Sequence, residues 1–101
     1  MIPIDTRRLG EFCRRWKVSR LEVFGSAIRD DFRPDSDVDL LATFAPDADW
    51  GLLDHAAMKR QLSTLLGREV DLLTREAVEH SRNPLRREAI LGSARLLHVP
   101  G

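Results

Sequence analysis

Cysteine, long apolar runs and an N-terminal leader pattern are what this sequence lacks or nearly lacks. Its single cysteine, Cys13, cannot form a disulfide within the chain, which is typical of proteins of a reducing compartment. No apolar run approaches the roughly 20 residues that a membrane-spanning helix needs. The first eight residues contain no apolar segment of the signal-peptide type. We therefore expect a soluble, cytoplasmic protein with no membrane partner.

An excess of positive charge is missing as well. The 16 Lys and Arg residues are matched by 16 Asp and Glu residues, so the formal net charge is zero. Proteins that bind nucleic-acid backbone usually carry surplus Lys and Arg on one face. Direct nucleic-acid binding is therefore not expected. The three histidines, His55, His80 and His98, are too dispersed in the sequence to predict a zinc site.

The composition is that of one compact domain. With 101 residues, of which 43% are hydrophobic and 32% charged, the chain can bury a single core and little more. No internal repeat or low-complexity tract is present. We expect one domain over residues 1–101.

A first helix is predicted near the N-terminus, with a cap at Asp5 or Thr6. Its apolar residues fall at i, i+3, i+4 and i+7 and so form one stripe, made of Leu9, Phe12, Cys13 and Trp16. This helix is expected to pack against the core. Further along, Trp50 either anchors the core or contacts a partner.

Two further helices are predicted in the second half of the chain. One runs from about Leu52 to Leu66, with Gly67 as its stop. The other begins near Asn83, whose side chain can cap while Pro84 takes the first helical position, and it ends near Gly92.

A short apolar stretch, residues 21–24, predicts a buried strand that breaks at Gly25 and passes into a candidate helical turn at Ser26. The first amides of a helix have no internal partner and carry partial positive charge, so they favour a phosphate. Gly25 would let the phosphate approach the backbone, while Ser26 and Arg29 could bind its oxygens. In the plainer alternative Gly25 is only a tight turn, Ser26 only a cap and Arg29 an ion-pair partner.

Asp37 and Asp39 lie at the start of a second predicted strand. Side chains at i and i+2 share one face of a strand, so both carboxylates point one way while Val38 and Leu40 point to the core. Two adjacent carboxylates repel each other without a cation. Mg²⁺ suits them, because it prefers oxygen ligands and is usually held by one or two carboxylates plus substrate phosphates. The alternative is a solvated turn and strand face.

Asp71 supplies a third carboxylate, on a strand predicted over residues 69–74. If this strand pairs beside the one carrying Asp37 and Asp39, the three carboxylates would form one cluster able to hold two metal ions. In the alternative, Asp71 is simply the polar half of an amphipathic edge strand.

Taken together, these residues resemble the nucleotidyltransferase superfamily related to DNA polymerase beta, and within it the minimal nucleotidyltransferases. The matching pattern is Gly25-Ser26, a gap of ten residues, Asp37-Val38-Asp39 and a later strand aspartate, Asp71. The segment 83–91 extends the resemblance over nearly the whole chain. It implies an α/β fold of the polymerase beta-like kind, a small mixed β-sheet with helices packed mainly on one face.

The resemblance also implies roles and a partner. The Gly-Ser turn would bind phosphate, with Ser36 as a further contact. Asp37 and Asp39 would bind metal, and Asp71 would serve as a metal ligand or base. Minimal nucleotidyltransferases of this type are often antitoxins of HEPN-class ribonuclease toxins, and some transfer AMP from ATP to a toxin tyrosine. We accordingly expect Mg²⁺-dependent transfer of AMP to a hydroxyl of such a partner, within a hetero-oligomer.

The sequence departs from the family pattern beside the Gly-Ser turn. The family usually has Gly-Ser-x-Ala-Arg-Gly, whereas Ile28 here replaces a small residue and Asp30 stands where glycine is common. Negative charge from Asp30 and Asp31 would disfavour a triphosphate unless both side chains point outward. The three candidate carboxylates are nevertheless intact.

Two other functions are compatible with these residues. A non-enzymatic antitoxin could keep the fold and neutralise its toxin by binding alone, although it would be free to lose the carboxylates. Transfer to a small molecule such as an aminoglycoside resembles other branches of the superfamily. Those enzymes usually carry an additional acceptor-binding domain, for which this chain is too short.

Overall fold

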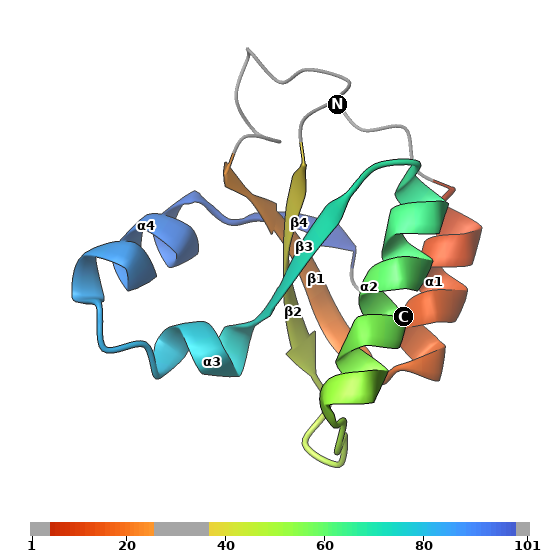
Figure 1. The fold of residues 1–101 in the computed structure, drawn as a ribbon, viewed down its shortest axis with the longest axis horizontal. Coiled ribbons are helices and arrows are strands. Elements are labelled where there is room, and N and C mark those ends of the chain that lie inside the picture. Colours follow the sequence, from red (N-terminus) through yellow and green to blue (C-terminus); the bar gives the residue numbers. More distant parts are fainter. Residues whose placement is uncertain (1–4, 26–36, 99–101) are drawn as a thin grey trace.

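The computed structural model describes residues 5–25 and 37–98, which form one four-stranded sheet with helices on either side (Figure 1). The elements follow in the order α1 (Thr6–Arg15), β1 (Val18–Phe24), β2 (Val38–Phe44), α2 (Leu52–Leu66), β3 (Val70–Thr74), α3 (Arg75–Glu79), α4 (Pro84–Ser93) and β4 (Arg95–His98). The residues predicted or discussed at positions 26–36, namely Ser26, Ile28, Arg29, Asp30, Asp31 and Ser36, lie outside the described part of the chain.

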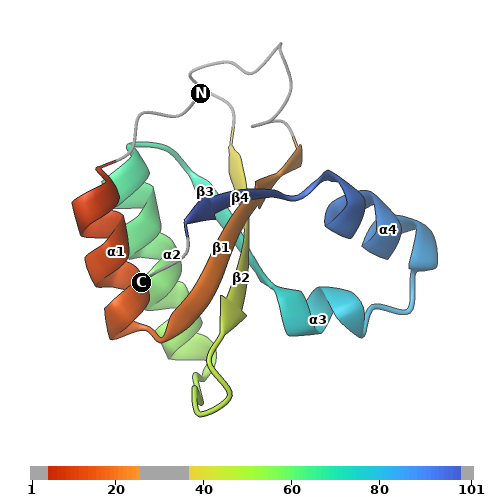
Figure 2. The ribbon, with the colours of Figure 1, turned by 180° about the vertical axis from the view of Figure 1, so that it is seen from behind.

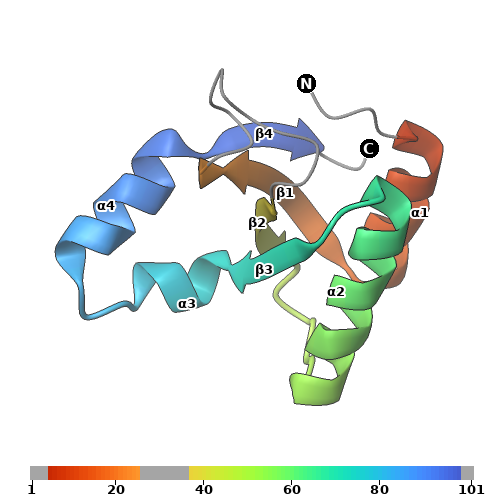
Figure 3. The same cartoon turned by 45° about the horizontal axis from the view of Figure 1, so that its top comes forward.

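The sheet is mixed, as expected, with the strand order β3-β2-β1-β4. β1 runs antiparallel to both of its neighbours, whereas β2 and β3 are parallel. Figure 3 shows the strands lying between the pair α1 and α2 and the pair α3 and α4. Because of these directions, the C-terminal end of β1 lies beside the N-terminal ends of β2 and β3, at the same end of the sheet.

α1 and α2 cover one face of the sheet and bury the main core (Figure 2). α1 begins as predicted, since the Asp5 carboxylate accepts hydrogen bonds from the amides of Arg7 at 3.1 Å and Arg8 at 3.3 Å. α2 has the predicted bounds and ends at Gly67, which adopts the left-handed conformation. The largest side chains fully buried in this core are Leu9, Leu21, Leu40, Met58 and Leu62.

α3 and α4 pack on the opposite face and cover part of it. They form a second, smaller core in which Val78 and Ile90 meet Phe24 and Leu41 of the sheet. α4 starts as predicted, because the Asn83 side chain accepts a hydrogen bond from the amide of Arg86 at 3.2 Å. α3 and α4 therefore flank one side of the sheet face that carries the acidic residues, the face opposite α1 and α2 (Figure 1).

No helix in the described part of the chain has the length and apolar content that crossing a membrane would require.

Candidate active site

Asp39 and Asp71 are direct neighbours on the sheet. They are partners in the parallel register of β2 and β3, where Val38 pairs with Val70 and Leu40 with Leu72. These four apolar side chains are buried in the main core, so the two aspartates between them must point to the other face. The prediction that the two strands pair and bring Asp71 beside Asp39 is confirmed.

Gly25 lies against Asp39 from the other side. Phe24, the last residue of β1, is the register partner of Asp39, and Gly25 follows with a φ of 71°, a left-handed conformation that favours glycine. A Cβ atom placed on Gly25 would collide with Oδ2 of Asp39. Glycine is thus required here for two reasons, its backbone conformation and the close approach of the carboxylate. The sequence predicted the turn but not this contact.

The electrostatics of Asp39 show the influence of the two neighbouring carboxylates. Its pKa is raised above the ordinary value, first by burial, then by the charge of Asp71 and then by that of Asp37. Asp37 and Asp71 are themselves exposed. Like charges gathered in this way cost free energy, and a bound cation would offset that cost.

The donor set fits Mg²⁺ held jointly with a substrate. Within residues 5–25 and 37–98, no group of three or more His, Cys, Asp or Glu side chains is placed to hold a metal ion by itself. Mg²⁺ does not require one, because it is usually bound by one or two carboxylates together with phosphate oxygens and water. Asp39 and Asp71, with Asp37 at the end of the strand, supply hard oxygen donors of that kind.

A buried ion pair on the same face escaped the sequence reasoning. Glu22 is only 4% exposed, and its Oε1 accepts a hydrogen bond from Nη1 of Arg75 at 2.9 Å. Arg20 lies 3.5 Å from the same oxygen, and Arg75 also pairs with Glu79 within α3. The alternation of β1 could have placed Glu22 on this face, but nothing local in the sequence pointed to Arg75, 53 residues away.

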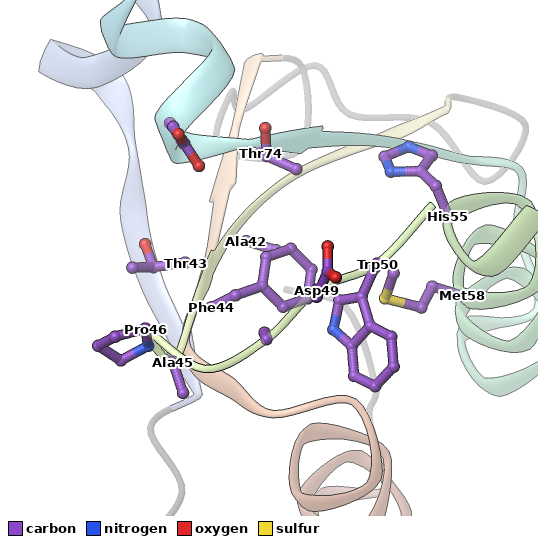
Figure 4. A pocket seen from close by; sticks show the side chains of 12 residues that line it. Ala42, Thr43, Phe44, Ala45, Pro46, Asp49, Trp50, His55, Met58 and Thr74 are labelled. Atoms are coloured by element: carbon purple, nitrogen blue, oxygen red, sulfur yellow. The ribbon is translucent and has the colours of Figure 1, made fainter. Parts of the chain in front are cut away.

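At the far end of β2 and β3 lies a cavity of about 460 Å³ (Figure 4). Aromatic and acidic side chains line it, together with His55, whose Nε2 is 2.9 Å from the carbonyl oxygen of Leu72. Trp50 belongs both to the core and to this cavity, since its Nε1 donates to the Trp16 carbonyl at 2.8 Å. The alternative in which Trp50 anchors the core is confirmed, and its contact with a partner stays a prediction.

Comparison with known proteins places the chain among nucleotidyltransferases. The family model for the nucleotidyltransferase domain matches residues 7–97. A relative from Methanocaldococcus jannaschii, named a putative protein adenylyltransferase, is 36% identical over 77 residues, which is 76% of each chain. The protein adenylyltransferase MntA of Thermococcus cleftensis is 35% identical over 76 residues, or 75% of each chain.

Solved structures agree with the fold described above. A minimal nucleotidyltransferase at 38% identity superposes with a TM-score of 0.65 and covers 91% of this chain and 92% of its own. A toxin–antitoxin structure with AMP-PNP superposes with a TM-score of 0.71, covering 95% of this chain and 74% of its own; at 16% identity it supports the fold alone. From the matched model, the relatives and the geometry at Gly25 and Asp39, the chain belongs to the nucleotidyltransferase domain family.

Proposed function

We propose that this chain is a Mg²⁺-dependent protein adenylyltransferase that transfers AMP from ATP to a tyrosine hydroxyl of a HEPN-class toxin and so acts as its antitoxin. Of two relatives above 30% identity, one is named a putative protein adenylyltransferase and the other the protein adenylyltransferase MntA. A solved complex of the same fold pairs MntA with HepT. The acceptor tyrosine must lie in the partner, because this chain contains no tyrosine.

The observation that carries the proposal is the contact set around Asp39. Asp71 is its register partner on one side, and Gly25 fits against its carboxylate on the other. The missing Cβ lets the Asp39 carboxylate lie against the strand end, beside the backbone where a triphosphate would bind. Ser26, Arg29 and Ser36 are further proposed phosphate contacts, on the strength of the sequence pattern.

In the proposed reaction the tyrosine oxygen attacks the α-phosphorus of ATP. A new O–P bond forms, the bond between the α-phosphorus and the bridging oxygen breaks, and pyrophosphate leaves with that oxygen. Of the neighbouring residues Asp39 and Asp71, Asp71 is the exposed one. Its carboxylate would accept the proton of the tyrosine hydroxyl. The chemistry that Mg²⁺ supplies when bound, as one ion or two, is neutralisation of the triphosphate and activation of the attacking hydroxyl.

Asp37 and Asp39 would hold the metal in this scheme. A cation would be favoured beside them, since burial and the charges of Asp71 and Asp37 all disfavour the ionised form of Asp39. A metal bound there would stabilise the ionised form of Asp39. Binding of ATP and of metal should therefore reinforce each other.

The test is intact-mass analysis after incubating the purified chain with ATP, Mg²⁺ and the HEPN-class protein from the same genome. The expected result is a partner that gains whole AMP units. The double variant Asp37→Asn/Asp39→Asn should give no gain, whereas Glu88→Gln, which removes an exposed carboxylate from α4, should behave as the unaltered chain does.

The same experiment separates the binding-only antitoxin from the enzyme. A stable complex with no mass gain from any nucleoside triphosphate would show that the chain neutralises by binding alone. A toxin that is still neutralised by the double variant would lead to the same conclusion. Neither result would question the fold.

A further inference from the structure

The smaller core, where α3 and α4 pack on the sheet, contains a second cavity of about 200 Å³, which we call the α3–α4 pocket. Four apolar side chains line it, among them the buried Val78 and Ile90, together with Ser81, Arg86 and Arg87. Ile90 follows Arg86 by four positions and Arg87 by three, so one side of α4 carries both arginines to the pocket.

The α3–α4 pocket lies on the same face of the sheet as the candidate carboxylates. Side chains alternate along β3, so Val70 and Leu72 are buried in the main core while Asp71 and Leu73 point to the opposite face. Leu73 packs in the smaller core and lines the pocket. Because side chains two positions apart on a strand are separated by about 7 Å, the pocket begins one side chain beyond Asp71.

The pocket is positively charged and has no counter-ion of its own. Its described lining includes Arg86 and Arg87 but no Asp or Glu. Neither guanidinium forms an ion pair within the described part of the chain. Nη1 of Arg87 donates a hydrogen bond to the Ser81 carbonyl oxygen at 3.2 Å, which holds this side chain between the two helices. Two guanidiniums beside an apolar surface favour a carboxylate whose methylene groups can cover that surface.

The direction of the proposed reaction indicates which molecule would bring this carboxylate. In phosphoryl transfer the attacking and leaving oxygens lie roughly in line through the phosphorus. The triphosphate is proposed to lie against Gly25, which follows β1, so the acceptor would approach from the other side of β2, where β3 carries Asp71. The nucleoside has no negative charge apart from its phosphates and so supplies no anion to the pocket. The acceptor protein is therefore the better source.

We propose that the α3–α4 pocket binds an aspartate or glutamate side chain of the toxin partner, within about four residues of the acceptor tyrosine. The carboxylate would pair with Arg86 and Arg87 while the tyrosine hydroxyl lies at Asp71. The separation of about 7 Å between these two places corresponds to two residues of an extended chain or about one turn of a helix. Charge complementarity carries the inference, which rests on the proposed function because it assumes a protein acceptor.

The test variant is Arg86→Glu, and Arg82→Glu is its matched control. Arg82 is exposed, lies between α3 and α4 and does not line the pocket, so the two variants change the local charge equally. The Asn83 cap accepts from the backbone amide of Arg86, which the substitution keeps, and a glutamate in the first turn of a helix does not oppose the helix dipole. Both variants should stay folded, which a circular dichroism melt can check.

Two measurements use the purified HEPN-class protein from the same genome. Calorimetry without nucleotide gives its dissociation constant, and AMP transfer gives the KM values for this protein and for ATP. Arg86→Glu should raise the dissociation constant and the KM for the partner at least about tenfold, with the KM for ATP changed less than about twofold. Arg82→Glu should change all three by less than about twofold.

The outcomes separate this inference from the proposed function. If Arg86→Glu binds and modifies the partner normally, or raises only the KM for ATP, the docking is wrong and the proposed function stands. A complex that is weakened by Arg86→Glu but never gains AMP would refute the transfer and support the docking. If the unaltered chain forms no complex and transfers no AMP, both proposals fall.

A charge exchange identifies the group that enters the pocket. Changing the acidic residue nearest the acceptor tyrosine of the partner to lysine should weaken binding to the unaltered chain and restore binding to Arg86→Glu. A modified tyrosine with no aspartate or glutamate within about four residues would overturn the inference, and so would a lysine variant that Arg86→Glu binds no better.

Discussion

Two carboxylates on the same face of the sheet have opposite surroundings. Glu22 is buried, and Arg75 reaches it from α3 at 2.9 Å. Asp39 is on the adjacent strand, where burial, Asp71 and Asp37 all raise its pKa. A buried carboxylate paired with an arginine fixes two elements relative to each other, whereas a carboxylate crowded by others costs free energy until a cation arrives. The comparison separates a structural acid from an acid suited to a ligand.

The largest expected effects come from neutralising each of the two carboxylates, Asp39 and Glu22, in separate variants. Asp39→Asn should reduce AMP transfer at least about a thousandfold, because it removes the proposed metal ligand, and it should not lower the melting temperature, because a repulsion is relieved. Glu22→Gln should lower the free energy of unfolding by about 1–3 kcal/mol, less than for a fully buried pair since the Arg75 side chain is one-third exposed. Transfer assays and urea titrations of both variants check this. A large loss of stability in Asp39→Asn would contradict the comparison.

A second prediction uses two glycines with the same backbone conformation. Gly25 and Gly67 have φ values of 71° and 67°, so alanine at either position should cost about 1 kcal/mol of stability through backbone strain. Only at Gly25 would the new methyl group meet Asp39; at Gly67 nothing lies within 4 Å. Gly25→Ala should therefore reduce transfer by about tenfold or more, while Gly67→Ala leaves it unchanged. Equal activity in the two variants would show that the contact with Asp39 is irrelevant.

Cys13 extends the comparison to a third ionisable group, buried in the apolar layer between α1 and the sheet. Burial raises its pKa from 9.0 to about 11, and nearby Arg14 offsets this only in part. The unfolded chain then ionises first as the pH rises. The stability due to the neutral thiol is complete below pH 9 and is lost as the pH rises toward about 11. Between pH 8 and pH 10.5, the urea midpoint of unfolding should fall further for the unaltered chain than for Cys13→Ala.

The smallest expected effect is a change in the pKa of Asp39. Because the charge of Asp71 contributes to the raised pKa of Asp39, Asp71→Asn should lower the Asp39 pKa toward its ordinary value without restoring it fully, since burial remains the larger cause. Carboxyl-carbon NMR titration of the two proteins in the absence of divalent ions measures it. An unchanged Asp39 pKa would mean that the two carboxylates do not interact across the strands.

The parts of the site that were predictable from the sequence are those set by local periodicity. The alternation in residues 37–40 and 70–72 placed Asp39 and Asp71 on the polar face, and apolar spacing with caps at Asp5 and Asn83 placed α1 and α4. These signals work because a strand or helix with one buried face repeats its chemistry along the chain. His55 and His80, too dispersed in the sequence to predict a zinc site, each contact a backbone carbonyl oxygen.

The elements that were missed are short or depend on distant partners. α3 has five residues and β4 has four, too few for a periodic pattern to stand out. The Glu22–Arg75 pair and the cavity at Trp50 join segments that are far apart in sequence, so only the folded chain reveals them. Because α3 was not foreseen, its packing over Leu41 on the acidic face was not foreseen either.

β1 is an interior strand only because β4 pairs with it, through partners such as Glu22 with Leu96 and Val23 with Arg95. Among the described strands β4 is the last to leave the ribosome. Until then, the strand that leads to Gly25 exposes one row of unpaired backbone N–H and C=O groups. Such an edge recruits strands from other molecules in crowded surroundings. Pairing with the closing strand, Arg95–His98, therefore removes an open edge from the strand that ends at Gly25.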